Sequence, residues 1–156
     1  MNFFPTDEAL GEALALCARE SGPSLAMVAR DVPLLSNLDV WANIALIKEY
    51  HENMAAAKAE GLVLGYLRRY DLEDIAYRRN PSLTPEERFC AMLLRAACVR
   101  DAIVVIDRPF LLLPQLQDAT RLFEMLAVIS DLYVRCHIFD YTWGKARYEV
   151  HDATEI

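Results

Sequence analysis

The sequence lacks paired cysteines, long apolar runs and an excess of basic residues, and each absence excludes a class of protein. Its four cysteines are widely spaced without a Cys-x-x-Cys pair, so we expect reduced thiols in a cytosolic setting. The apolar runs, such as residues 102–106, fall far short of the roughly 20 residues of a membrane-spanning helix. Acidic residues outnumber basic ones by 23 to 16, and the net charge of −7 predicts repulsion from nucleic acid and anionic lipid headgroups.

The composition is that of an ordinary globular domain. Of the 156 residues, 54% are hydrophobic and 25% are charged, which predicts one domain over residues 1–156 with an apolar core. The first residues show no basic region followed by a long apolar stretch, so we expect no secretory signal. We therefore predict a cytoplasmic protein that at most lies peripherally at the cytoplasmic face of the inner membrane, without inserting into it.

Hydrophobic periodicity and turn residues predict a succession of helices and strands. Helical patterns occupy residues 7–22, 38–50, 51–69, 72–78, 85–99 and 114–132, and strand-like runs occupy residues 24–29, 102–107 and 133–139. We expect residues 147–151 to form a further strand at the edge of the sheet. Gly61 and Gly65 predict close packing of their helix against a neighbour. The order of elements in the C-terminal half predicts a right-handed, mainly parallel α/β layer.

Two local motifs place individual side chains. Residues 84–87 combine a hydroxyl cap, a proline at the first helical position and a glutamate that reaches back to the amide of the cap. The run 102–107 ends in Asp107, whose carboxylate we expect at the C-terminal edge of a buried parallel strand, paired with Arg108 or another cation. The three histidines have no ligand-like neighbours, so we predict structural roles for them.

Three separated segments together resemble the ATPases of ABC transporters, and among these the Mla-like lipid-transport ATPases. Residues 27–45 are similar to the strand, Q-loop and following helix of that family, residues 80–97 lie where it carries its signature motif, and residues 103–110 resemble its Walker B strand. The resemblance runs from about residue 24 to residue 150 and implies a truncated P-loop NTPase-like α/β fold with a small, mainly parallel sheet. It would comprise an N-terminal helix of open origin (1–22), a helical subdomain (38–99) and a Walker-B-side α/β part (100–156).

The residues that this family needs for ATP hydrolysis are missing or replaced. A Walker A loop requires glycines, a lysine and a hydroxyl, and the only Gly-Lys pair, residues 144–145, lies near the wrong end of the chain. Arg30 replaces the Q-loop glutamine, and Phe139 replaces the switch histidine. Thr84, Pro85 and Glu86 replace the serine and the two glycines of the signature motif. Asp107 survives at the Walker B position, but Arg108 replaces the neighbouring catalytic glutamate. Arginine cannot accept a proton from water, and glutamate repels phosphate. The resemblance therefore implies no catalytic residue, no metal site and no cofactor.

One surface of the family keeps its character in this sequence. In ABC ATPases the region around the Q-loop receives a short coupling helix of the membrane permease, and the corresponding residues here are Leu34, Leu35, Asn37, Leu38 and Trp41. Trp41, with its neighbours at helical spacing, also fits a buried core stripe. The resemblance implies an inactive subunit that docks on a transporter membrane subunit or pairs with an active ABC ATPase as a homo- or heterodimer. Two alternatives stay open: a remnant half-site in a composite ATPase, and a free regulatory or scaffold domain.

Overall fold

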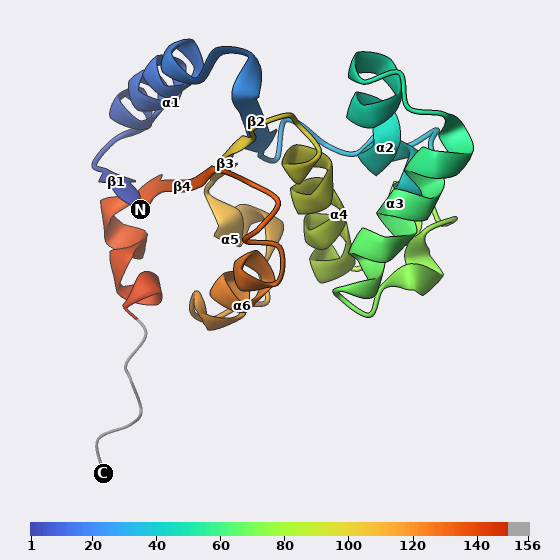
Figure 1. Ribbon diagram of the computed structural model, residues 1–156. Coiled ribbons are helices and arrows are strands. Elements are labelled where there is room, and N and C mark those ends of the chain that lie inside the picture. The colour runs from blue at the N-terminus through green and yellow to red at the C-terminus, as the bar shows by residue number, and fades with distance from the viewer. Residues whose placement is uncertain (150–156) are drawn as a thin grey trace.

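The computed structural model describes residues 1–149, which form an α/β fold around a parallel sheet (Figure 1). Four strands, β1 (Asn2–Phe4), β2 (Leu25–Val28), β3 (Ile103–Asp107) and β4 (Arg135–Tyr141), pair in the order β1-β4-β3-β2, and every pairing is parallel. Val104–Asp107 of the central strand β3 are buried, as expected for a parallel sheet covered on both faces. No helix among the described residues is long and apolar enough to cross a membrane.

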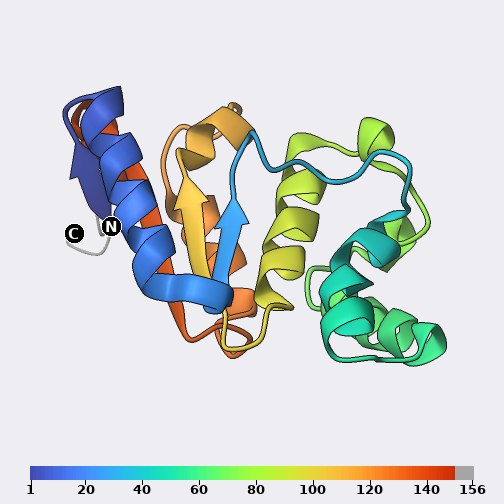
Figure 2. The same cartoon turned by 90° about the horizontal axis from the view of Figure 1, so that it is seen from above.

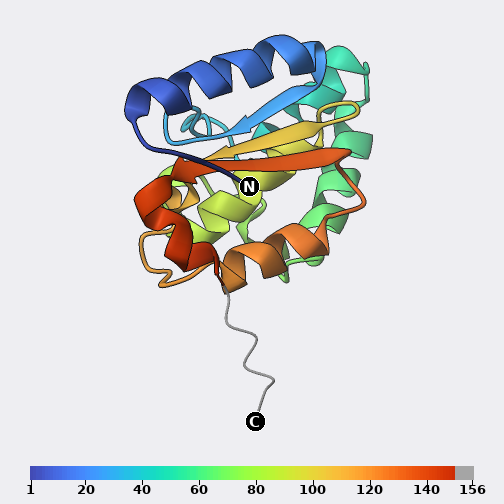
Figure 3. The same cartoon turned by 90° about the vertical axis from the view of Figure 1, so that its left-hand side faces the viewer.

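Helices cover the two faces of the sheet unequally (Figures 2 and 3). On one face α1 (Asp7–Ser21) leads from β1 at one edge to β2 at the other and contacts β1 and β4. On the opposite face lie α4 (Pro85–Ala97), α5 (Pro109–Leu112) and α6 (Thr120–Val128). The largest part of the core lies on this second face, where Val104 and Ile106 of β3 meet the apolar side of α4.

A group of helices extends the molecule beyond the edge strand β2. α2 (Val40–His51) and α3 (Ala56–Arg68) pack on each other, and α2 also packs on α4. The 3-10 turns η1 (Gly22–Ser24), η2 (Glu73–Ile75) and η3 (Asn80–Ser82) lie in the connections. Val40 and Ile44 are fully buried and Trp41 packs against the core with part of its surface exposed, so this face of α2 is a core stripe.

Several predicted elements are confirmed with small shifts of their ends. The first helix ends at Ser21, before Gly22, whose positive φ of 54° suits a glycine. The predicted strands 24–29 and 102–107 are β2 and β3, and the predicted helix 85–99 is α4. Its capping box is present: the Thr84 hydroxyl accepts from the Glu87 amide at 3.2 Å, and the Glu87 carboxylate accepts from the Thr84 amide at 2.8 Å.

The prediction of a single helix over residues 114–132 is wrong, because only residues 109–112 and 120–128 are helical in this part of the chain. Arg147 donates to the carbonyls of Leu116 and Gln117, and the Ala119 amide donates to the carbonyl of Arg147 at 2.8 Å. These bonds hold the intervening segment in an irregular path although its apolar spacing resembles that of a helix. The predicted helices 38–50 and 51–69 correspond to α2 and α3 with shifted ends, whereas of residues 72–78 only 73–75 form a 3-10 turn.

The predicted edge strand at residues 147–151 is also wrong. Arg147 and Tyr148 belong to η4 (Thr142–Tyr148), a 3-10 helix, and residues 150–151 lie outside the described part of the chain. The Tyr148 ring packs edge-on against Phe3 and Phe110, with ring centroids 5.2 Å apart in both pairs. This buried position favours the helical turn. The strand at this edge is instead β1, which the sequence analysis did not predict.

Gly61 and Gly65 do not mediate close helix packing, contrary to the prediction. A Cβ atom added at either position would meet no other atom within 4 Å. α3 packs through its other side, where Ala59, Val63 and Leu67 recur every four residues and are fully buried.

Candidate functional site

The carboxyl ends of β3 and β4 bring two aspartates to one edge of the sheet. Asp107 is the last residue of β3 and Asp140 the penultimate residue of β4, and both side chains are buried. Parallel α/β proteins bind ligands beyond this edge of their sheets. Asp107 lies where the sequence predicts it.

Arg108 neutralises Asp107 with a two-pronged contact. Its Nε and Nη2 atoms donate to the two carboxylate oxygens of Asp107 at 2.8 and 2.9 Å. This contact raises the pKa of Arg108 and is of the strong, charge-assisted kind. The predicted pairing of Asp107 with a cation is therefore confirmed. A metal ion could bind Asp107 only by displacing the guanidinium.

The backbone of Arg108 is left-handed, with φ 47° and ψ 66°. This conformation costs roughly 1–2 kcal/mol for a residue with a Cβ atom. The Arg108 amide donates to the carbonyl of Phe139 at 2.8 Å, which ties the turn after β3 to β4. Phe139 itself is buried and stacks on Phe4 of β1 at 5.5 Å between ring centroids, so it has a packing role.

Tyr141 and Asp7 extend this contact to α1. Arg108 Nη1 donates to the Tyr141 hydroxyl at 3.1 Å, and that hydroxyl donates to the Asp7 carboxylate. Arg108 Nη1 also lies 3.8 Å from Asp7 Oδ1. Five residues from α1, β3, β4 and the turn after β3 are called the strand-tip cluster below. They are Asp7, Asp107, Arg108, Asp140 and Tyr141. Its members bind one another across the ends of β3 and β4 and the start of α1.

Asp140 is held by η4. Its Oδ2 atom accepts from the Tyr148 hydroxyl at 2.5 Å, and its Oδ1 atom accepts from the Tyr141 amide at 2.8 Å. Burial raises the pKa of the Asp140 carboxyl, and the hydrogen bond from Tyr148 and the charge of Arg147 oppose that rise. Burial likewise raises the pKa of Tyr148. The carboxyl thus has polar partners but no ion pair among residues 1–149.

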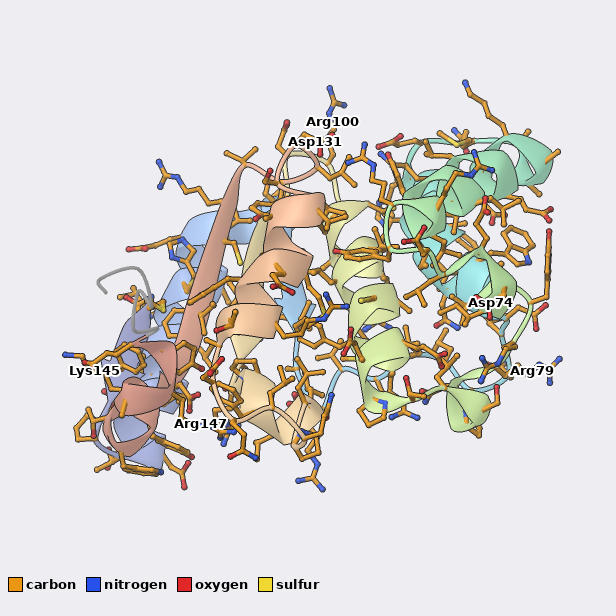
Figure 4. The ribbon with its side chains drawn as sticks, turned by 90° about the horizontal axis from the view of Figure 1, so that it is seen from below. Asp74, Arg79, Arg100, Asp131, Lys145 and Arg147 are labelled. Carbon is orange, nitrogen blue, oxygen red and sulfur yellow. The ribbon has the colours of Figure 1, made fainter. Side chains whose placement is uncertain are left out.

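A cavity of about 310 Å³ opens beside the strand-tip cluster, and its wall includes Arg108, Asp140, Trp143 and Arg147. Both arginines of this wall have partners within the chain, because the Arg147 guanidinium lies 3.5 Å from the centroid of the Phe110 ring and donates to backbone carbonyls, and Arg108 pairs with Asp107. Figure 4 shows Lys145 pointing away from the body of the molecule, and Arg147 near the segment before α6. The Gly-Lys pair of residues 144–145 therefore forms no phosphate cradle.

The connection from β1 to α1 also does not fit a phosphate. A P-loop is a long glycine-rich loop between a strand and a helix, whose amides surround the phosphates. Here only Pro5 and Thr6 join Phe4 to Asp7, and the Thr6 hydroxyl caps α1. The first turn of α1 carries Asp7 and Glu8, whose negative charges oppose an anion. The residues present therefore do not fit Mg-ATP, and no group of three or more potential metal ligands occurs in residues 1–149.

Thr84, Pro85 and Glu86 lie at the start of α4 and do not line the cavity at the strand tips. Thr84 and Pro85 begin the helix, and Glu86 forms an ion pair with Arg121 of α6, with 2.8 Å between Nε and Oε1. These signature-like positions therefore stabilise α4 and its contact with α6.

The segment between β2 and α2, residues 29–39, is held by the buried Asn43 and the partly buried Arg95 and is called the pinned loop below. Asn43 Oδ1 accepts from the Leu35 amide at 2.7 Å, and its Nδ2 atom lies 3.0–3.2 Å from the carbonyls of Leu35, Leu38 and Asp39. Arg95 of α4 donates to the carbonyls of Val32 at 2.5 Å and Pro33 at 2.7 Å. Burial lowers the pKa of Arg95.

The pinned loop turns some apolar side chains inward and others outward. Leu34 is 2% exposed and belongs to the core, so it is unavailable to a partner. Val32 and Leu35 are 39% and 47% exposed, and Asn37 is exposed as well. Leu38 and Trp41 are partly buried, and Arg30 is exposed at the start of the loop. Of the predicted docking residues, all but Leu34 therefore keep some exposed surface, and Val32 is a further exposed apolar side chain in the same loop.

Several important residues were not predicted from the sequence. Asp140 ends a strand-like run just as Asp107 does, so the same rule would have found it. Asn43 and Arg95 stand among apolar residues on helices, which marks polar groups that must be satisfied inside the fold. Asp7 and Tyr141 carry no such signal, because their pairing joins residues 134 positions apart.

The cysteines offer no reactive thiolate in the interior. Burial raises the pKa of Cys90 to about 12 and that of Cys98 to about 11, so both thiols are protonated at neutral pH.

Compared with models of known protein families and with curated proteins, the sequence matches none of them.

Proposed function

We propose that this protein is a catalytically inactive, ABC-ATPase-like subunit that works by protein contact, docking through the pinned loop on a transporter membrane subunit or on an active ATPase. The observation that carries the proposal is the contrast between two neighbouring sites at one sheet edge. In the strand-tip cluster Arg108 is occupied by the carboxylate of Asp107, whereas the pinned loop exposes Val32 and Leu35 on a fixed backbone.

The topology supports a P-loop NTPase-like fold of reduced size. β1, its short turn and α1 form a strand-turn-helix unit beside β4, which is the arrangement in which a P-loop would occur. Asp107 ends the central strand as a Walker B aspartate does. In this interpretation α1 corresponds to the helix behind Walker A, and a two-residue turn replaces the loop.

The pinned loop has the features of a docking surface. Exposed apolar side chains clustered on a surface mark contact sites when the backbone is held in place, because less conformational entropy is lost on binding. Arg95 and Asn43 supply that restraint through hydrogen bonds to the backbone of the loop. A short amphipathic helix of a partner would fit Val32 and Leu35 with its apolar side.

A co-purification experiment tests the docking. We expect the wild-type chain to be retained by detergent-solubilised membranes of the expressing cells, and the double substitution Val32→Asp with Leu35→Asp to reduce retention at least tenfold. Val134→Asp is the matched control, since Val134 is also exposed but lies before β4, at the other end of the sheet. Equal retention of the wild-type chain and the double variant would refute docking through this loop.

A thermal-shift titration tests the loss of nucleotide binding. With millimolar Mg-ATP we expect no saturable rise in the melting temperature, because a ligand that binds only the folded state must stabilise it. A saturable rise would overturn the inactive-site part of the proposal while leaving the docking surface untouched.

A further inference from the structure

Half of one edge of β4 has no neighbouring strand. β4 has seven residues, but β1 pairs only with Phe139–Tyr141. Among residues 1–149 no strand pairs with the same side of residues 135–138, and Figure 3, which looks onto this side, shows the start of β4 uncovered by β1. The other side is occupied, because β3 pairs with β4 from Arg135 to Phe139.

The hydrogen bonds of β4 show which of its backbone groups face outward. The Arg135 amide and the Phe139 carbonyl bond toward β3 and the turn that follows it. Because backbone groups alternate along a parallel strand, those of Cys136 and Ile138 face the opposite side. Unpaired groups of this kind form a template for a further strand.

A cavity of about 370 Å³ adjoins this free edge, between α1 and the sheet. Leu16 of α1, Ile103 of β3 and Phe139 of β4 give it an apolar part, and Glu20 of α1 is among its polar lining residues; Leu16 is 48% exposed. Side chains alternate along a strand, so Arg135, His137 and Phe139 all face this cavity. A strand added at the free edge would place every second side chain over the cavity.

The positive charge of Arg135 at this edge favours an extended segment that carries a negative charge. Arg135 is exposed at the start of β4, and no carboxylate in the described part of the chain lies within ion-pair distance of it. A carboxylate on an added strand would complement it.

We propose that the free half-edge of β4 binds an extended acidic segment of another protein, which pairs with residues 135–138, places an apolar side chain in the cavity beneath α1 and sets a carboxylate opposite Arg135. An extended polypeptide is the partner that satisfies a row of backbone donors and acceptors. The segment would lie end to end with β1 and continue the same ladder. A second copy of this chain is a poorer partner, because each copy carries a net charge of −7. This surface is separate from the pinned loop, so the two proposals stand independently.

A peptide titration followed by NMR tests this proposal. The probe is the capped hexapeptide DTVTVT, in which the aspartate and both valines share one face. Added to the ¹⁵N-labelled full chain, it should give saturable shifts and slow the hydrogen exchange of the Cys136 and Ile138 amides about tenfold near saturation. The same peptide with both valines N-methylated keeps every side chain but loses the valine amide donors that face β4 in a parallel ladder, and should bind at least tenfold more weakly.

Two protein variants test the charge. Arg135→Glu should weaken binding of the peptide about two- to fivefold, as expected for an exposed ion pair. Arg100→Glu, at an exposed arginine that Figure 4 shows pointing away from the molecule, should leave it unchanged. The proposal is overturned if no chemical shifts change up to about 5 mM peptide, or if the N-methylated peptide binds equally well. It is also overturned if protection of the Cys136 and Ile138 amides depends on protein concentration alone, because that result would assign the edge to a second copy of the chain.

Discussion

The strand-tip cluster and the pinned loop both follow the carboxyl ends of adjacent strands in one sheet. The polar groups of these two regions nevertheless have different roles. In the cluster, Arg108 satisfies Asp107 and reaches Tyr141, so charged groups bind one another and leave little for a ligand. In the pinned loop, Asn43 and Arg95 satisfy only the backbone, so the side chains of Val32 and Leu35 remain available. The difference shows that polar groups can occupy one another or hold a surface in place, depending on whether they bind side chains or main chain.

The largest expected effect comes from removing the support of the pinned loop. Asn43→Ala leaves the Leu35 amide and several carbonyls without partners and creates a cavity, which should lower the free energy of unfolding by about 3 kcal/mol. Urea denaturation measures this. Asn37→Ala is the control at an exposed asparagine in the same loop, and should cost at most about 0.5 kcal/mol. If the two variants lose equal stability, the loop is not held by Asn43.

The next effect probes the closed cluster. Arg108→Ala leaves the buried Asp107 carboxylate without its cation, and should cost about 2 kcal/mol of stability, less than for a fully buried pair. Arg108→Gly should be about 0.5–1 kcal/mol more stable than Arg108→Ala, because glycine adopts the left-handed backbone without strain. Chemical denaturation of both variants tests this order. A reversed order would mean that the turn relaxes when the side chain is lost.

A smaller, pH-dependent effect concerns Asp140. Its folded-state pKa is raised by burial, so the folded protein binds a proton more readily than the unfolded chain, and stability declines as pH rises from about 4 through that raised pKa. Asp140→Asn removes this contribution, since Asn cannot ionise and still accepts from Tyr148. The melting temperature of the wild type minus that of the variant should therefore fall with rising pH. A difference that stays constant or grows with pH contradicts the raised pKa.

The smallest effect on stability is expected at Leu35, an exposed apolar residue of the pinned loop. Leu35→Ser removes a half-exposed side chain and should change the free energy of unfolding by no more than about 0.5 kcal/mol. Leu34→Ser, one residue earlier but in the core, should cost several times as much. Comparable losses at both positions would show that Leu35 packs inward and would remove the basis of the docking surface.

Local patterns predicted much of the fold, and their failures share one cause. The capping box at Thr84 and the buried run that ends at Asp107 each depend on a few adjacent residues, and both were predictable. The segment before α6 shows helical spacing, but distant Arg147 binds its carbonyls and prevents the helix. β1 has only three residues, too few for a periodic signal, and exists because β4 offers it a ladder.

By itself, the sequence determined that this chain forms a parallel α/β domain and that Asp107 ends a buried strand. Those properties follow from residue types and short-range spacing. Tertiary structure alone decided that Leu34 faces inward while Leu35 faces outward, that Asp7 meets Tyr141, and that β1 pairs only with Phe139–Tyr141 of β4. Such outcomes depend on contacts between residues far apart in the chain, whose partners no local pattern can specify.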